Sequence, residues 1–109
     1  MSFFQSDVVR AEMAEIHELQ EEIYSNVFKF PTMKREDKKY HVDILERLLE
    51  KQKVMYARLS LSDDPDAMKM KEQLEKSVQL MGFPAGTDMN LIFSGMTKTI
   101  DKLKQVVDY

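Results

Sequence analysis

The sequence contains no cysteine and no tryptophan, and it has only three glycines and three prolines among 109 residues. Without cysteine the chain has no disulfide bridge and no thiolate metal ligand, which excludes a disulfide scaffold, a zinc finger and thiol redox chemistry. No apolar run approaches the roughly 18 residues of a membrane-spanning helix, and the N-terminus lacks a signal-peptide pattern. We therefore expect a soluble, cytoplasmic protein with no membrane partner.

The scarcity of glycine and proline leaves little material for turns, whereas Glu, Lys, Leu and Met are abundant. This composition favours a few long helices over many strands. At this length we expect one domain, residues 1–109.

Charge is distributed unevenly along the chain. The net charge of −3 argues against a general nucleic-acid binder. Residues 1–28 carry six acidic side chains and one arginine, whereas residues 29–58 carry nine Lys or Arg and five acids. We expect these two segments to be antiparallel neighbours. Exposed ion pairs contribute only about half a kcal/mol each, so they set the pairing preference rather than the stability.

A first helix is predicted over residues 7–29. Ser6 and Asp7 form a helix-start signal, and Pro31 ends the helix because it disfavours a helical Phe30 and has no amide hydrogen. One position of the apolar seam is polar, Gln20. The other seam residues are Val9, Met13, Ile16, Ile23, Val27 and Phe30, and Leu19 and Tyr24 widen the stripe.

A second helix is predicted over residues 33–60, and it also carries a glutamine, Gln52, in its seam. Its length is about 40 Å, whereas a compact globule of this size is only about 34 Å across. Either the monomer is elongated or another subunit covers the projecting part. The apolar seam residues are Leu45, Leu48, Met55 and Leu59, broadened by Val42, Leu49 and Tyr56.

A third helix is predicted over residues 65–81, because Ser62 and the acids around Pro65 form a helix-start signal. Gly82 is expected to end it in a left-handed conformation. The predicted seam is Ala67, Met70, Leu74, Val78 and Met81.

A fourth helix is predicted over residues 88–107, capped by Thr87 or Asp88. Gly95 inside it is interpreted as a mark of close helix crossing. The predicted seam is Met89, Ile92, Phe93, Met96, Ile100, Leu103 and Val107. The predicted fold is therefore all-α: an elongated antiparallel hairpin or bundle of about four helices, which we expect oligomerisation to complete.

Few residues offer catalytic or metal chemistry. His17 and Glu21 are spaced to hold an adventitious metal, or His17 is simply a half-exposed side chain on a charged helix. A carboxylate-bridged metal bundle needs Glu three residues before each His, but positions 14 and 38 are Ala and Lys. The acids at 63, 64 and 66 fit helix capping better than a calcium loop. We predict no catalytic residue, metal, cofactor or small-molecule ligand.

Two segments are candidates for partner binding. The basic stretch around Lys34 either grips phosphate or an acidic protein surface, or is a solvated helix start next to the acidic first helix. Phe3 and Phe4 either fold onto the bundle as a plug or are an exposed anchor for another protein. The predicted partner-binding residues are Phe3, Phe4, Met33, Lys34, Arg35, Lys38 and Lys39.

Methionine is unusually frequent, with eight residues beyond the initiator. Six of them lie on predicted seams, so most are interpreted as core filler. Met33 and Met68 fit the seams less well. The alternative is a soft, adaptable surface that receives a partner helix.

Several short matches spread along the chain resemble one family. They are Phe3-Phe4 followed by Ser6-Asp7-Val8-Val9, Arg35-Glu36 with Lys38-Lys39, Leu61-Ser62 with a following acid, and Met96-Thr97-Lys98-Thr99-Ile100. In these residues the chain resembles a small helical family of cyanobacteria and the tailed phages that infect them. The resemblance implies an intracellular helical protein, which a phage can carry, and it supplies no catalytic residue.

We therefore expect a non-enzymatic interaction or adaptor protein that binds itself and a host or phage protein. One alternative is a transcription-associated or nucleic-acid-contacting factor that uses the basic residues at 34–39. Another is an enzyme or metal carrier that uses His17 or His41.

Overall fold

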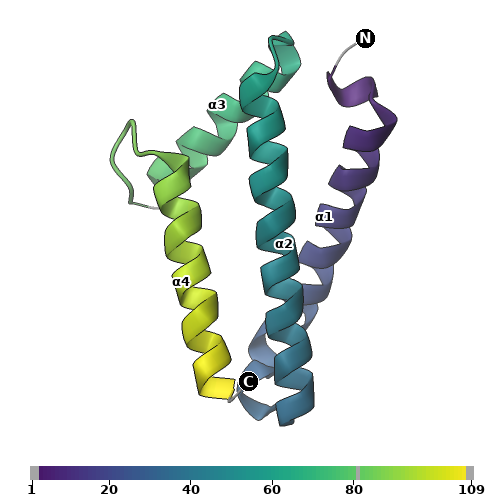
Figure 1. Cartoon of the computed structure of the whole chain (residues 1–109), viewed down its shortest axis with the longest axis vertical. Coiled ribbons are helices and arrows are strands. Elements are labelled where there is room, and N and C mark those ends of the chain that lie inside the picture. The colour runs from purple at the N-terminus through teal and green to yellow at the C-terminus, as the bar shows by residue number, and fades with distance from the viewer. Residues whose placement is uncertain (1–2, 81, 108–109) are drawn as a thin grey trace.

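The computed structural model describes residues 3–80 and 82–107. Over these residues the chain consists of helices and their connections, with no strand, which confirms the all-α fold. The four α-helices are α1 (Asp7–Asn26), α2 (Arg35–Leu61), α3 (Pro65–Leu80) and α4 (Met89–Val107) (Figure 1). Two short 3₁₀ helices, η1 (Phe3–Gln5) and η2 (Val27–Thr32), precede α1 and α2. None of the described helices is long and apolar enough to span a membrane.

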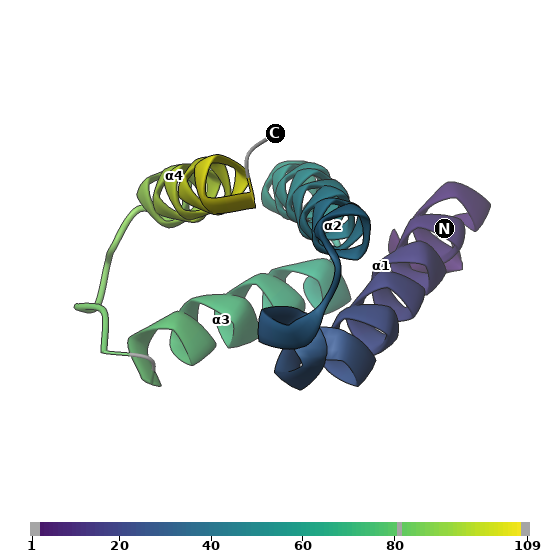
Figure 2. The same ribbon diagram turned by 90° about the horizontal axis from the view of Figure 1, so that it is seen from below.

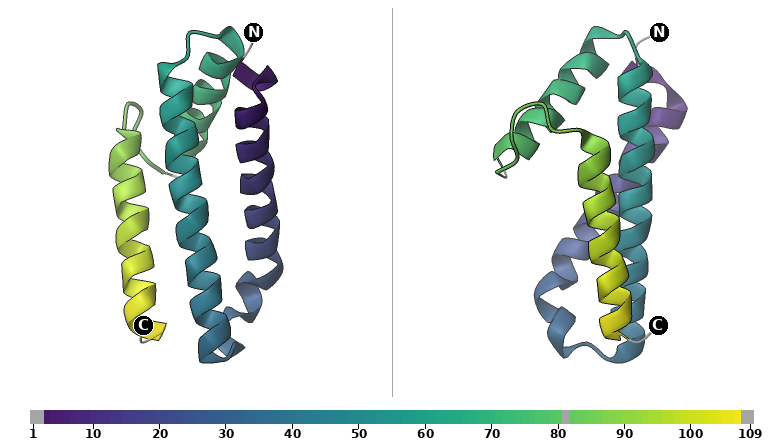
Figure 3. Two further views of the ribbon diagram at one scale, coloured as in Figure 1. Left: turned by 45° about the vertical axis from the view of Figure 1, so that its right-hand side comes forward. Right: turned by 60° about the vertical axis from the view of Figure 1, so that its left-hand side comes forward.

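The long helix α2 is the centre of the molecule. Seen along the long axis, α4, α2 and α1 lie in a row, and α3 lies across one side of that row (Figure 2). We call this side the inner side. Figure 3 shows α3 leaving the C-terminal end of α2 at an angle and diverging from it. The molecule measures 46 × 33 × 20 Å, so it is elongated and thin.

The predicted pairing of the acidic and basic segments is confirmed between α1 and α2. Arg58 Nε lies 3.2 Å from Glu12 Oε2, and the Lys51 ammonium pairs with Glu15. Nearer the start of α2, the Tyr40 hydroxyl donates to Glu22 Oε1 across 2.9 Å. Residues later in α1 therefore contact residues earlier in α2, which shows that the two helices are antiparallel neighbours.

Helix α1 ends at Asn26, three residues before the predicted end. The side chains of Ser25 and Asn26 each donate across 2.8 Å to the backbone carbonyl four residues earlier, on Glu21 and Glu22. Such side-chain bonds compete with the helical backbone pattern, and the chain tightens into η2, which contains Pro31. Helix α2 consequently begins at residue 35 rather than 33, and it ends one residue later than predicted.

The start and end signals of α3 act as expected. The Asp64 amide donates to Ser62 Oγ across 3.1 Å, and the Asp66 amide donates to Asp64 Oδ1 across 2.9 Å. The Asp64 carboxylate therefore caps the helix. Gly82 adopts a φ of 101° just after α3, and its amide donates to the Gln79 carbonyl across 3.0 Å. Met81, a predicted seam residue and the predicted helix end, lies outside the described residues.

The core is divided into two clusters. The first lies mainly between α2 and α4 and receives Phe30 of η2 and Val78 of α3 at its edges. Its buried members are Val42, Leu49, Met89, Ile92, Phe93, Ile100 and Val107. The second joins α1, α2 and α3. Its buried members are Val9, Met55, Leu59 and Ala67, with Phe3, Phe4, Ile16 and Met70 packed against them.

The prediction that Gly95 marks a close helix crossing is wrong. A Cβ atom placed there would have no neighbouring atom within 4 Å beyond its own helix, so no helix packs against this position. Gly95 lies on the exposed side of α4.

Candidate functional site

Phe3 and Phe4 fold onto the bundle in this structure, the first of the two alternatives considered for them. Both rings are half-buried against the second core cluster, and they meet edge to face with centroids 5.0 Å apart. The Phe3 amide also donates to the Asp64 carboxylate, and Arg10 Nε donates to the Phe4 carbonyl across 3.1 Å. Hydrogen bonds from the Phe3 and Asp66 amides hold the pKa of Asp64 below its ordinary value.

The predicted basic residues lie at the other end of α1, separated from Phe3 and Phe4 by a helix about 30 Å long. Lys34 and Arg35 are exposed, whereas Met33 and Lys39 are half-buried. Lys38 is also half-buried, and its ammonium lies 5.7 Å from the centre of the Phe30 ring. The seven predicted partner-binding residues therefore do not form one site.

Two exposed aromatic side chains lie next to these lysines: Phe28 was not singled out from the sequence, and the prediction that Tyr24 widens the apolar stripe of the first helix is wrong. The ring of Phe28 is 93% exposed, and Tyr24, one turn earlier, is also exposed. Val27 was placed in the buried seam but is exposed. Val27 is the first residue of η2, where the α-helical spacing on which the seam was predicted ends. We call Tyr24, Phe28, Lys29 and Lys34 the basic corner.

The two histidines lie in different environments. His17 is exposed, and its Nε2 atom lies 3.0 Å from Glu21 Oε1. His41 is buried beside Phe30, and burial lowers its pKa, an effect that the charge of Glu22 partly opposes. Among residues 3–80 and 82–107, no three acidic or histidine side chains are placed to hold a metal ion.

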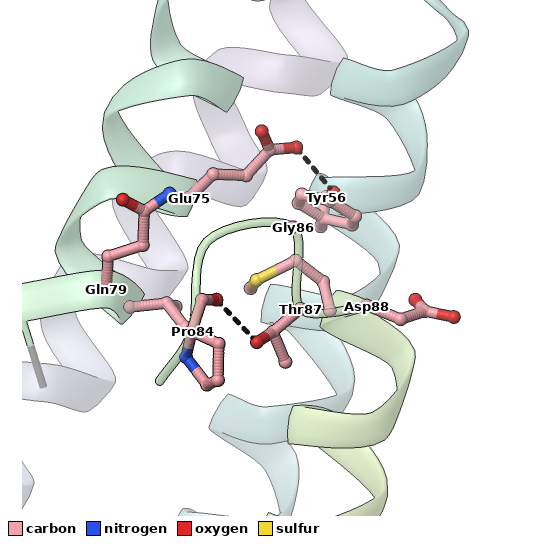
Figure 4. Close-up of a pocket in the computed structure, with 9 residues that line it drawn as sticks. Tyr56, Glu75, Gln79, Pro84, Gly86, Thr87 and Asp88 are labelled. Carbon is pink, nitrogen blue, oxygen red and sulfur yellow. Dashed lines mark hydrogen bonds between the residues drawn. The ribbon is translucent and has the colours of Figure 1, made fainter. Parts of the chain in front are cut away.

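A small cleft of about 220 Å³ lies between α2, α3 and the loop that leads to α4 (Figure 4). Inside it, the Tyr56 hydroxyl donates to Glu75 Oε1 across 3.1 Å. Burial raises the pKa of Tyr56, and Glu75 and Asp88 raise it further, so the phenol stays protonated. Asp88 caps α4 by accepting the Asn90 amide across 2.9 Å.

The cleft offers a neutral hydroxyl and a carboxylate that already bond to each other. Drug-sized ligands usually occupy pockets of roughly 300–1,000 Å³, so this cleft has room only for a smaller group. Sequence reasoning missed the Tyr56–Glu75 pair because the two residues are 19 positions apart on different helices, and no local pattern connects them.

A third surface consists of seam residues that the fold leaves half exposed. Met13, Leu74 and Met96 were predicted to be core, but they are 36%, 37% and 39% exposed. Leu48 and the two seam glutamines, Gln20 and Gln52, are half-buried. These side chains lie on faces that are buried elsewhere along the same helices.

The molecule as a whole exposes more surface than a compact protein of its size. Its accessible surface is 7817 Å², whereas a compact monomer of 12.8 kDa exposes about 6,300 Å². Its radius of gyration is 15.6 Å, against about 13 Å for a compact domain of this length. The excess exposed surface is therefore about 1,500 Å².

Comparison with known proteins gives one match. No curated protein and no solved structure matches the chain. A family described as a domain of unknown function (DUF1825) matches residues 1–107, nearly the full length. The protein therefore belongs to the DUF1825 family.

Proposed function

We propose that this protein is a non-enzymatic interaction or adaptor protein and that it works as a homo-oligomer. The observation that carries the proposal is the excess of about 1,500 Å² of exposed surface over a compact monomer of the same mass. A specific protein–protein interface takes about 800 Å² from each partner, so the excess is large enough for one such contact.

The nature of the exposed side chains supports the same proposal. Fifteen large hydrophobic side chains among the described residues are exposed, and they occur on all four α-helices. Single exposed apolar residues are ordinary on protein surfaces. Exposed seam residues on several neighbouring helices are less common on monomers. Exposing each apolar side chain to water costs free energy, which a partner surface would recover by covering it.

Sedimentation velocity and light scattering on the full chain at micromolar concentrations test this proposal. We expect a particle whose mass is a multiple of 12.8 kDa and which dissociates on dilution. A strictly monomeric particle over the whole concentration range would show that self-association is wrong.

The basic corner favours a second candidate function, contact with single-stranded nucleic acid. Residues 27–35 carry three cations and no acid, and the exposed rings of Phe28 and Tyr24 provide flat faces for bases to stack on. Binding of a single-stranded oligonucleotide would weaken steeply with salt and weaken again in Phe28→Ala. Lys98→Gln, an exposed change on α4, is the control. No binding at low salt would remove this candidate.

The resemblance noted from the sequence suggests a setting for the interaction. We propose that the protein acts in the cytoplasm of a cyanobacterium or of a phage-infected cell, where a host or phage protein is its second partner. Affinity purification with the wild type and with Phe28→Ala tests this setting, because Phe28 is almost fully exposed and contributes little to the core. A specific protein lost only from the Phe28→Ala sample would support it, whereas identical protein lists would argue against the basic corner as the contact.

A further inference from the structure

We propose that a second copy of this chain covers one particular surface, formed by Met13, Gln20, Leu48, Gln52, Leu74 and Met96. We call this surface the central inner face. The inference rests on the proposed self-association and names the surface responsible for it. It follows from where these side chains lie relative to the two core clusters.

The four helices bring Met13, Gln52, Leu74 and Met96 to nearly the same level along α2, and Leu48 and Gln20 lie one to two turns nearer its start. The Glu12–Arg58 ion pair places Met13 opposite the turn of α2 that contains Met55. The Tyr56–Glu75 hydrogen bond places Leu74 beside the same turn. On the other side of α2, the rings of Tyr56 and Phe93 are 5.9 Å apart, so Met96 lies about one turn lower, near Gln52.

At this level along α2, the contacts of α3 with the second core cluster have ended and those with the first have not yet begun. We call this region the gap between the two clusters. Along α3, Met70 packs on the second cluster and Val78 on the first, and Leu74 lies between them at helical spacing. Along α1, Met13 lies one turn from the buried Val9 and from Ile16, which packs on the second cluster. The seams therefore continue across the gap, but the side chains there are only partly covered.

Helix α3 covers only one end of the inner side, and η2 lies at the other end (Figures 2 and 3). Met96 shares a helical face with Ile92 and Ile100, which are both buried, yet it is exposed. Its exposure therefore results from the missing neighbour opposite it and not from its position on the helix. One further helix from another molecule would supply that neighbour.

The chemistry of the surface fits another copy of itself. In a two-fold dimer the same patch meets its own image, so it must be self-complementary. The six side chains carry no charge that would repel an identical surface. Methionine adapts its shape to an apolar neighbour, and a glutamine amide both donates and accepts hydrogen bonds.

The positions of Gln20 and Gln52 also support a second copy of the chain as the partner of this surface. Both interrupt otherwise apolar seams and both are half-buried in the isolated chain. A single polar residue in such a seam lowers stability but selects one register and one oligomeric state, because its amide must find a partner across the interface.

The first test compares two charge substitutions on the same helix by sedimentation of the full chain. Met96→Glu places a carboxylate in the central inner face, whereas Leu91→Glu places one on the exposed outer side of α4. We expect Met96→Glu to weaken self-association by on the order of 100-fold and Leu91→Glu to leave it nearly unchanged. Circular dichroism establishes that each variant is folded, and Met13→Glu replaces Met96→Glu should that variant unfold.

The outcomes separate this inference from the function on which it rests. A wild-type chain that stays monomeric overturns self-association, and the inference with it. A wild-type oligomer that persists in the folded Met96→Glu and Met13→Glu variants leaves self-association standing and overturns the central inner face as its site.

A second test uses the absence of native cysteine. Single cysteines introduced as Gln52→Cys and Leu74→Cys on the central inner face, or as Leu91→Cys outside it, report which surfaces meet between copies. We expect intermolecular cross-links with short bifunctional thiol reagents for the first two variants and not for the third. Cross-linking of Leu91→Cys alone would overturn the inference.

Discussion

The imidazole of His41 lies against the ring of Phe30, with the two ring centroids 5.3 Å apart. His41 belongs to α2 and Phe30 to η2, so this contact joins the turn after α1 to the start of the central helix. The histidine is buried and its pKa is lowered, so it is preferentially neutral in the folded protein.

This contact predicts a dependence of stability on pH. The unfolded chain protonates His41 near pH 6.5, whereas the folded chain protonates it only at lower pH. The unfolded state therefore binds more protons in this window, and the free energy of unfolding falls as the pH drops from about 7 to about 5.5. Urea unfolding at the two pH values measures the change.

Two histidine variants show whether His41 causes that change. His41→Phe should reduce the loss of stability between the two pH values, because it removes the group that must be protonated. His17→Gln, a substitution at the exposed histidine, is the control variant. An undiminished loss of stability in His41→Phe between the two pH values would contradict the assignment.

Gly95 provides a prediction of increased stability. It lies inside α4 on the exposed side, and a Cβ atom there meets nothing within 4 Å. Gly95→Ala should therefore raise the free energy of unfolding by about 0.5–1 kcal/mol, because alanine is the better helix former. Gly82→Ala should instead destabilise the protein, because Gly82 has a φ of 101°. Thermal unfolding of both variants measures the opposite signs.

The hydrogen bond between Tyr56 of α2 and Glu75 of α3 can be tested by removing one hydroxyl. Tyr56→Phe deletes the donor to Glu75 and keeps the ring that packs on the first cluster. We therefore expect the free energy of unfolding to fall by about 0.5–1.5 kcal/mol. Tyr24→Phe, on an exposed tyrosine, should have no measurable effect. In a double-mutant cycle with Glu75→Gln, a coupling free energy of zero would show that the bond does not contribute.

Two leucines two positions apart on α2 test where the second core cluster lies. Leu59 is 2% exposed and Leu61 is 88% exposed. Leu59→Ala should cost about 2–5 kcal/mol, because it leaves a cavity between α1, α2 and α3. Leu61→Ala should change the free energy of unfolding by less than about 0.5 kcal/mol. Similar losses for the two variants would contradict the described packing.

The helix boundaries could be predicted where the signal is local. Pro65 and the acids around it start α3, Gly82 follows its end, and Asp88 caps α4, because each acts on backbone groups only a few residues away. The end of α1 was less predictable. Pro31 was recognised, but the hydrogen bonds of Ser25 and Asn26 that turn the chain into η2 earlier were not.

The candidate sites could be predicted only in part. The lysines and arginine near the start of α2 are visible as a charged run, and Phe28 lies outside the predicted seam, but only the structure shows that Phe28 is 93% exposed beside them. Met13, Leu74 and Met96 have the same helical spacing as core residues, so periodicity alone places them in the core. Their exposure depends on the angle at which α3 leaves α2.

The sequence alone determined that this protein is helical, roughly where its helices begin and end, and that the acidic first segment pairs with the basic second one. These properties depend on hydrogen bonds, turn residues and charges whose effects act over a few positions or along a whole face. Only the tertiary structure decided that the core is split into two clusters, that Tyr56 meets Glu75, and that a band of seam residues between the clusters is uncovered. An apolar seam can pack against any other apolar seam. The angles between helices and the connecting turns therefore decide which surfaces meet.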